Sequence, residues 1–162
     1  MRLYLIRHAE AVPLGTEGVS TDEERPLTEA GRASCGPLAK ALGRIGVKLD
    51  RLFTSPLVRA VQTAEGLVAG WQGEPPPVEE TPLLSPGKKK RKLATMLGHA
   101  GGEALGLVGH NPDLSELVGW FIGDKGIGVN MEKAGVACLE FERRPARAGG
   151  MLVWLITPEW TR

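Results

Sequence analysis

Short apolar runs that alternate with longer helix-like stretches are the feature that most limits what this chain can fold into. The pattern predicts strands at residues 2–7, 51–55, 78–81 and 103–110, and helices at 25–46, 57–71, 88–102 and 111–123. Two last strands, at 135–142 and 151–158, are predicted to form a hairpin. Strands that alternate with helices are typical of a largely parallel sheet with helices on its faces. We therefore expect an α/β layer structure.

Four features of the sequence refine the predicted bounds of the first two helices. Thr28 is a good N-cap for the first helix, whereas Gly36-Pro37 inside that helix is expected to bend or interrupt it. Ser55 is predicted to cap the second helix, with Pro56 as its first residue.

Length and composition indicate one globular domain over residues 1–162. A chain of 162 residues with 42% hydrophobic composition can bury a core without disulfides. Cys35 and Cys138 lie far apart without C-x-x-C spacing, which fits a reducing, cytoplasmic setting and predicts neither a disulfide framework nor a zinc ribbon. The apolar runs are shorter than a signal peptide or a membrane span requires. A net charge of +1 provides no general attraction for nucleic acid.

Polar side chains gather at the ends of the predicted strands. Arg7 and His8 end the first strand, Arg59 follows the second, and His110 ends the fourth. Ligands of open α/β sheets bind outside the carboxyl ends of the strands, where helix N-termini favour anions. Arginines, histidines and helix starts without a carboxylate pair form a cup suited to phosphate chemistry without a metal.

Each of these residues also has an ordinary structural interpretation. An Arg-His pair is often a solvated strand end, Arg59 could lie on a helix surface, and His110 could be a core histidine or a helix cap. The three histidines His8, His99 and His110 lack the spacing of zinc ligands. It is the shared position of the polar residues at strand and helix ends that favours the functional interpretation.

Four motifs extend this pattern over most of the chain: "LIRHAEA", "RPLTEAG", "SPLVRAVQTA" and "VGHNP", in this order. Together they resemble the histidine phosphatase superfamily, and the short length and the "ERPLTEAG" loop are most similar to the SixA-type phosphohistidine phosphatases. The resemblance implies a phosphoglycerate mutase-like fold, a three-layer α/β/α sandwich with a mostly parallel central sheet. It also implies a metal-independent phosphatase that needs no cofactor.

The resemblance further assigns roles to residues of this sequence. His8 would be the nucleophile, attacking phosphorus with a neutral ring whose other nitrogen is held by a neighbouring carbonyl, and a phosphohistidine would form. Arg7 and Arg59 would clamp the phosphoryl oxygens, and His110 would donate a hydrogen bond to them. The complete set of expected substrate contacts is Arg7, Arg25, Arg59, His110 and Asn111.

One departure from the wider family bears on the substrate. Many members carry a glutamate after the third strand as general acid, but here Ser85 stands in that segment. Glu79, Glu80 and Glu10 are the candidate replacement proton donors. An imidazole leaving group with a pKa near ~6.5 needs much less protonation than an alkoxide. The departure therefore predicts phosphohistidine on a protein partner as substrate.

Two other functions stay open on the sequence. One is a small-molecule phosphomonoesterase that uses a displaced glutamate as acid, and the other is a non-catalytic module that binds phosphate or phosphoproteins. The basic run at 88–92 is either a solvated helix face or a guide for an acidic or phosphorylated protein. Such short basic strings are common, so we expect neither nucleic acid nor membrane as a partner.

Overall fold

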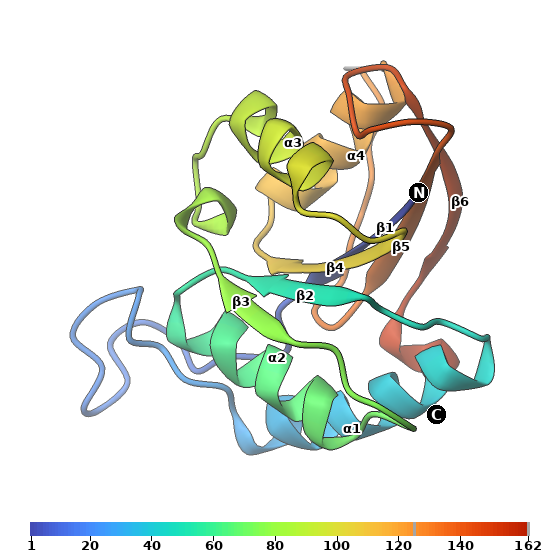
Figure 1. The fold of residues 1–162 in the computed structure, drawn as a ribbon. Coiled ribbons are helices and arrows are strands. Elements are labelled where there is room, and N and C mark those ends of the chain that lie inside the picture. Colours follow the sequence, from blue (N-terminus) through green and yellow to red (C-terminus); the bar gives the residue numbers. More distant parts are fainter. Residues whose placement is uncertain (125, 162) are drawn as a thin grey trace.

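A six-stranded sheet forms the centre of the computed structural model, which describes residues 1–124 and 126–161 (Figure 1). The strands are β1 (Arg2–Arg7), β2 (Arg51–Thr54), β3 (Val78–Glu80), β4 (Ala104–Gly109), β5 (Val136–Phe141) and β6 (Gly150–Ile156). They are ordered β3-β2-β4-β1-β5-β6. The pairs β1–β4, β2–β4 and β2–β3 are parallel, and only β5 runs against its neighbours β1 and β6. The predictions of a mostly parallel sheet and of a final hairpin are confirmed.

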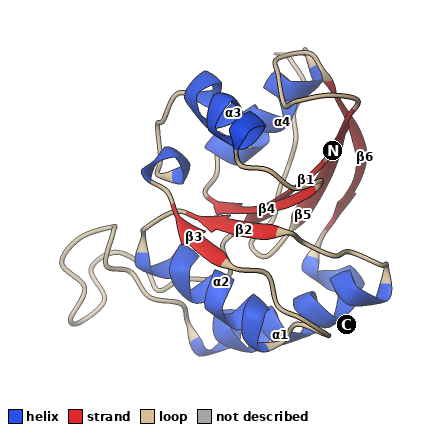
Figure 2. Cartoon of the chain, viewed as in Figure 1, coloured by secondary structure: helices blue, strands red, loops and turns tan. Residues whose placement is uncertain are grey.

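Helices cover both faces of this sheet (Figure 2). The helices are α1 (Glu29–Arg44), α2 (Val58–Ala69), α3 (Lys90–His99) and α4 (Asp113–Ile122), with short 3₁₀ turns η1 (Pro82–Leu84) and η2 (Pro158–Thr161). One apolar cluster joins the sheet to α1 and α2, and a second joins it to α3 and α4. This arrangement confirms the three-layer α/β/α sandwich.

Strand β1 shows why an unbroken apolar run marks the middle of such a sheet. Successive side chains of a strand point to opposite faces. Leu3 and Leu5 accordingly belong to the α3–α4 cluster, whereas Tyr4 and Ile6 belong to the α1–α2 cluster. The strand is therefore buried on both sides between Arg2 at its start and Arg7 at the carboxyl edge of the sheet.

Two local predictions need correction. Pro37 does not interrupt helix α1, because its side chain is exposed while Cys35 and Leu38 on either side stay in the core. The missing N–H therefore costs one hydrogen bond without ending the helix. Helix α2 begins at Val58 after Leu57, so Ser55 is not its N-cap and Pro56 is not its first residue. Thr28 does cap α1, by accepting a hydrogen bond from the Gly31 N–H.

Within residues 1–124 and 126–161, no helix is both long enough and apolar enough to cross a lipid bilayer. Cys35 and Cys138 are both buried free thiols.

Candidate active site

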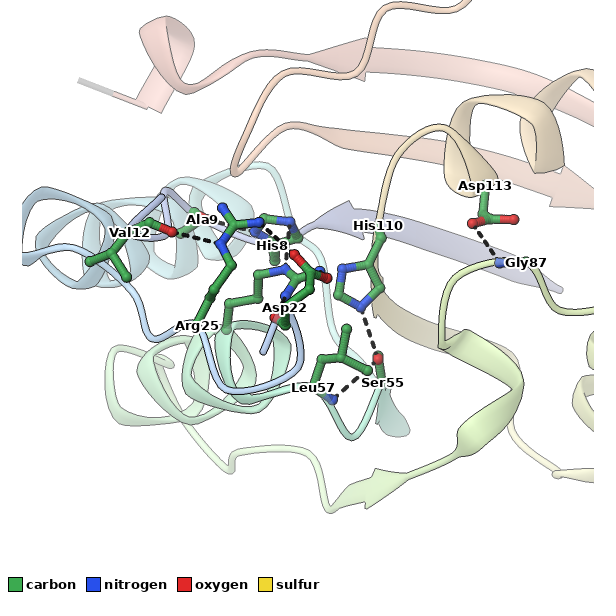
Figure 3. Close-up of polar contacts among 11 residues, drawn as sticks. His8, Ala9, Val12, Asp22, Arg25, Ser55, Leu57, Gly87, His110 and Asp113 are labelled. Atoms are coloured by element: carbon green, nitrogen blue, oxygen red, sulfur yellow. Dashed lines mark hydrogen bonds and ion pairs between the residues drawn. The ribbon is translucent and has the colours of Figure 1, made fainter. Parts of the chain in front are cut away.

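Three neighbouring strands deliver side chains to one cup at the carboxyl edge of the sheet. His8 follows β1, His110 follows β4 and Ser55 follows β2, while Arg59 comes from the first turn of α2. The ring centroids of His8 and His110 are 5.1 Å apart (Figure 3). All four side chains are buried. The structure thus brings together residues that lie up to a hundred positions apart in the chain.

The hydrogen bonds of His8 define its tautomer. Its Nδ1 lies 2.7 Å from the carbonyl oxygen of Ala9, which can only accept, so this nitrogen carries the proton. Arg59 Nε lies 3.3 Å from His8 Nε2 and donates to it, so Nε2 holds the lone pair. The Ala9 N–H in turn donates to Thr63 Oγ1 at 3.0 Å, which helps to fix the carbonyl that orients the ring.

Burial lowers the pKa of His8 to about 4. The positive charges of Arg59, Arg7 and Arg25 act in the same direction, and the Ala9 carbonyl opposes them. A neutral imidazole is the nucleophilic form of histidine. His8 is therefore unprotonated at Nε2 at neutral pH and needs no separate base, although Arg59 donates to this nitrogen in the structure.

Ser55 orients the second histidine. Its hydroxyl oxygen lies 2.9 Å from His110 Nε2 and accepts a hydrogen bond from the Leu57 N–H at 3.3 Å. The hydroxyl proton then has His110 Nε2 as its acceptor, and on this pattern we assign the ring proton of His110 to Nδ1. His110 Nδ1 is buried and has no hydrogen-bond partner among the described residues. Burial, then the charges of His8 and Arg59, lower the pKa of His110 to about 3.

Arg59 and Arg25 share one carboxylate. Arg59 donates through Nη1 to the backbone oxygen of Asp22 and through Nη2 to Asp22 Oδ2 at 2.8 Å. Arg25 donates through Nη1 to Asp22 Oδ1 at 2.7 Å and through Nε to the backbone oxygen of Val12 at 2.6 Å. These guanidinium groups lower the pKa of Asp22, with the hydrogen bond from Arg25 as the largest cause. Asp22 is therefore an anion that lies against the cup.

Arg7 and Asn111 both use the backbone oxygen of Met131. Arg7 Nη1 donates to it at 2.8 Å and Asn111 Nδ2 at 3.0 Å. Arg7 Nε and Asn111 Oδ1 are buried and have no partner among the described residues. Buried polar atoms are rarely left without a partner, so Arg7 Nε and His110 Nδ1 are two donors available to an anionic ligand.

The structure does not bring the three candidate glutamates into the cup. Glu79 forms an ion pair with Arg51 at 2.8 Å, near the start of β2 and away from its carboxyl end. Glu80 is exposed to solvent at the end of the edge strand β3. Glu10 is also exposed, and its carboxylate contacts Lys133 at 3.4 Å and Thr28 Oγ1 at 3.3 Å.

A shallow hollow beside His110 is lined by a different carboxylate. Besides His110, its polar lining comes from Ser85, Lys88, Lys90 and Asp113, and leucines contribute the rest. Asp113 Oδ2 accepts a hydrogen bond from the Gly87 N–H at 3.0 Å (Figure 3). Ser85 thus does lie beside the cup, whereas Asp113 was not anticipated.

The described part of the chain has no cluster of side chains that could bind a metal ion. Among residues 1–124 and 126–161, no three His, Cys, Asp or Glu side chains lie close enough to hold a metal ion. His99 is exposed at the end of α3, where its Nδ1 lies 2.7 Å from the backbone oxygen of Thr95.

Sequence reasoning missed Asp22, Asp113 and the contact of Ser55 with His110. Asp22 lies in the irregular segment between β1 and α1, where no periodicity indicates which way a side chain points. Asp113 resembles an ordinary acidic residue in the first turn of a helix. The role of Ser55 could have been predicted, because Ser55 directly follows a strand, as His8 and His110 do.

Comparison with protein families identifies the superfamily of the chain. Residues 3–85, which include His8 and Arg59, match the family model of the histidine phosphatase superfamily, branch 1. The chain belongs to this superfamily. A relative of similar length, an uncharacterized protein from Picosynechococcus sp., is 35% identical over 165 residues, which cover 99% of this chain and 98% of the relative. Membership of the histidine phosphatase superfamily makes the chain a phosphatase.

Solved structures of histidine phosphatases have the same fold. The protein histidine phosphatase SixA complexed with tungstate matches with a TM-score of 0.83 and 23% identity, over 100% of both chains. An Escherichia coli structure described as a putative alpha-ribazole-5'-P phosphatase matches with a TM-score of 0.68 and 20% identity, over 98% of this chain and 97% of that one. Since these two phosphatases are named for different substrates, the fold alone does not select one.

Proposed function

We propose that this histidine phosphatase forms a phosphohistidine on His8 without a metal ion, and that its substrate is phosphohistidine on a protein partner. The observation that carries the proposal is the hydrogen-bonded state of His8, with Nδ1–H on the Ala9 carbonyl and the lone pair on Nε2. In this proposal residues 1–162 act as one histidine phosphatase domain in a reducing, cytoplasmic setting.

In the first step, the Nε2 lone pair of His8 attacks phosphorus, and the bond from phosphorus to the leaving group breaks with its electron pair going to that group. Arg7 and Arg59 hold the non-bridging oxygens, and the Nδ1–H of His110 donates to one of them. In the second step, water attacks phosphorus, the bond to Nε2 breaks, and its electron pair returns to His8. Inorganic phosphate then leaves.

The polar groups around the cup support a nitrogen leaving group. None of Glu79, Glu80 and Glu10 contacts His8 or His110 within the described chain, and Ser85 lines the hollow where a glutamate would act as acid. A phosphohistidine ring that is protonated on its other nitrogen leaves phosphorus as a neutral imidazole, whose conjugate acid has a pKa of ~6.5, and so needs no proton donor from the enzyme, whereas an alkoxide depends on one. The likeness to the protein histidine phosphatase SixA points to the same class of substrate.

The basic run supports a protein partner. Lys88 and Lys89 are exposed and Lys88 lines the hollow beside His110, whereas Lys90 is paired with Glu116 at 2.6 Å. Free lysines at the rim would attract the acidic or phosphorylated surface of a protein.

The direct test is to trap the intermediate. The wild-type chain and His8→Asn are incubated with 4-nitrophenyl phosphate, quenched, and analysed for protein-bound phosphate. We expect alkali-stable, acid-labile phosphate on the wild type only. A wild type that binds phosphate but never becomes labelled would instead identify a binding module. A panel of phosphohistidine proteins, sugar phosphates and nucleotides then compares kcat/KM, and faster hydrolysis of sugar phosphates would refute the proposed substrate.

Asp113 favours a second candidate, a small-molecule phosphomonoesterase. Its carboxylate lines the hollow beside His110 and is held there by the Gly87 N–H. A carboxylic acid in that position could protonate an alkoxide in place of the missing glutamate. Asp113→Asn separates the two candidates: a loss of activity toward an alkyl phosphate, with no loss toward a phosphoramidate, would favour the phosphomonoesterase.

A further inference from the structure

The two arginines at the mouth of the cup are already occupied by an anion of the chain itself. Asp22 Oδ2 accepts from Arg59 at 2.8 Å and Asp22 Oδ1 accepts from Arg25 at 2.7 Å. A bidentate bridge between two guanidinium groups is the way that a phosphoryl group would engage them. The Asp22 carboxylate therefore uses an N–H donor of Arg59, which the proposed function assigns to the substrate, and one of Arg25, which the sequence predicts as a substrate contact.

Asp22 also lies close to the reacting histidines. Figure 3 shows its carboxylate between the His8 and His110 rings and Arg25. Its negative charge raises the pKa of His110 against the stronger effect of burial. The carboxylate thus occupies the region where the oxygens of a transferring phosphoryl group would lie.

The partners of this ion pair differ in burial. The Arg59 side chain is 5% exposed, whereas that of Asp22 is 45% exposed. Asp22 belongs to the long segment between β1 and α1, and Arg59 to the first turn of α2. When the pair opens, Asp22 is therefore the member that can turn into solvent, and Arg59 stays in the cup.

The pairing also affects the nucleophile. While Arg59 directs Nη1 and Nη2 to Asp22, its Nε–H points at His8 Nε2 from 3.3 Å and occupies the lone pair. An incoming phosphoryl group would have to replace Asp22 on Arg59 and come between Arg59 and His8. Exchange of Asp22 for a phosphoryl group would therefore free the Nε2 lone pair of His8 and place the phosphoryl oxygens on Arg59.

We propose that Asp22 is a built-in competitor for the phosphoryl subsite and thereby weakens the binding of every anion that uses Arg59 and Arg25. This inference rests on the proposed function, because it takes the cup to be a phosphoryl site. An anion engages the two arginines only while Asp22 is displaced. A phosphoryl group that also reaches Arg7 and His110 gains binding from two groups for which Asp22 does not compete.

The size of the effect follows from competition. A protein whose binding-competent state is only fractionally populated loses apparent affinity by that fraction. If the Asp22 pairing is closed in roughly nine molecules of ten, its removal tightens anion binding about tenfold. Simple competition applies the same factor to every anion that uses the two arginines.

Asp22→Asn tests the proposal, because asparagine keeps the shape of the side chain and removes its charge. Glu23→Gln is the matched control, since it removes the same charge one residue away from an exposed side chain. Calorimetric titration with vanadate, inorganic phosphate and sulfate gives a dissociation constant for each variant without any need for turnover. Circular dichroism checks folding, and Asp22→Ala is a second variant in case the asparagine amide still engages the arginines.

We expect Asp22→Asn and Asp22→Ala to bind all three anions about tenfold more tightly than the wild type, and Glu23→Gln to stay within about twofold of it. Equal or weaker binding by folded Asp22 variants would overturn the inference and leave the proposed function intact, because Asp22 would then only position the arginines. Equal tightening by Glu23→Gln would also overturn it, as an effect of net charge. Failure of the wild type and the variants alike to bind any of the anions would overturn the proposed function together with the inference.

Discussion

Replacement of Ser55 by alanine removes the hydrogen bond that orients the His110 ring but leaves the His110 side chain in the protein. The Ser55 hydroxyl is the hydrogen-bond partner of His110 Nε2, at 2.9 Å, and also accepts from the Leu57 N–H. In Ser55→Ala the ring can carry its proton on either nitrogen, so the donor at Nδ1 is no longer fixed. We expect Ser55→Ala to retain the fold but to lose part of the stabilisation that His110 gives to the transferred phosphoryl group.

The loss in kcat for Ser55→Ala is expected to be smaller than the loss on removal of the whole His110 side chain. Removal of a whole donor to developing charge costs about 10²- to 10³-fold in kcat, which is the expectation for His110→Ala. Ser55→Ala removes only one neutral hydrogen bond that orients the donor, worth about 1 kcal/mol, which corresponds to a fall of about 5- to 10-fold in kcat. Since Ser55 is fully buried, water has poor access to replace the hydroxyl, and we expect a loss of about 1–3 kcal/mol in the free energy of unfolding.

A double-mutant cycle in 4-nitrophenyl phosphate hydrolysis gives the decisive measurement. If Ser55 acts through His110, Ser55→Ala should reduce kcat in the wild-type background but have almost no effect in His110→Ala. Thermal unfolding of all four proteins identifies the assay temperatures at which each is folded. Equal factors in the two backgrounds would refute the assigned role of Ser55, because the loss would then be independent of the imidazole.

Three further predictions concern the same cup and its rim. In NMR titrations the His8 ring should stay neutral until the pH approaches about 4, and the His110 ring until it approaches about 3. Since unfolded histidine titrates near ~6.5, the unfolded chain binds more protons below that pH, and the free energy of unfolding should fall as the pH decreases from ~6.5 to the folded values; titration of either ring near ~6.5 would contradict this. Arg59→Lys should reduce kcat/KM for 4-nitrophenyl phosphate by about 10²-fold, because an ammonium cannot hold two oxygens as a guanidinium does, and a change below about threefold would exclude a bidentate clamp. Lys88→Gln with Lys89→Gln should slow turnover of a phosphohistidine protein at low salt but not that of 4-nitrophenyl phosphate, and equal effects on both substrates would argue against docking at this rim.

The regular part of the cup could be predicted because the sheet itself determines it. His8 and His110 each follow an apolar run that is buried on both faces, and the carboxyl ends of parallel strands meet at one edge of a sheet. Arg59 could be placed in the same way, because it lies in the first turn of the helix after β2. For these residues the period of the apolar side chains was sufficient to indicate the position in space.

The part of the cup that comes from the loop before α1 could not be predicted, because no sheet or helix determines where its side chains lie. Asp22 and Arg25 lie in a segment with no apolar period, and their contacts depend on where the loop folds back over α2. Glu79 was a candidate acid as a displaced replacement for the glutamate that many members carry after the third strand, but on β3 it forms an ion pair with Arg51. Pro37 was expected to bend or interrupt α1, yet the helix continues, and burial of the flanking residues outweighs one lost hydrogen bond. For Glu79 and Pro37, tertiary contacts outweigh the local sequence pattern.

The division of the cup between sheet and loop has a consequence for how such an enzyme can be altered. His8, His110 and Ser55 emerge from three adjacent central strands, whereas Asp22 and Arg25 belong to the connection before α1. Transplanting that connection from another superfamily member would leave the reacting imidazoles in place while exchanging the groups that we propose to compete with incoming anions. If Asp22 has this role, the anion affinity of the cup can be changed through the connection alone, without any redesign of the core.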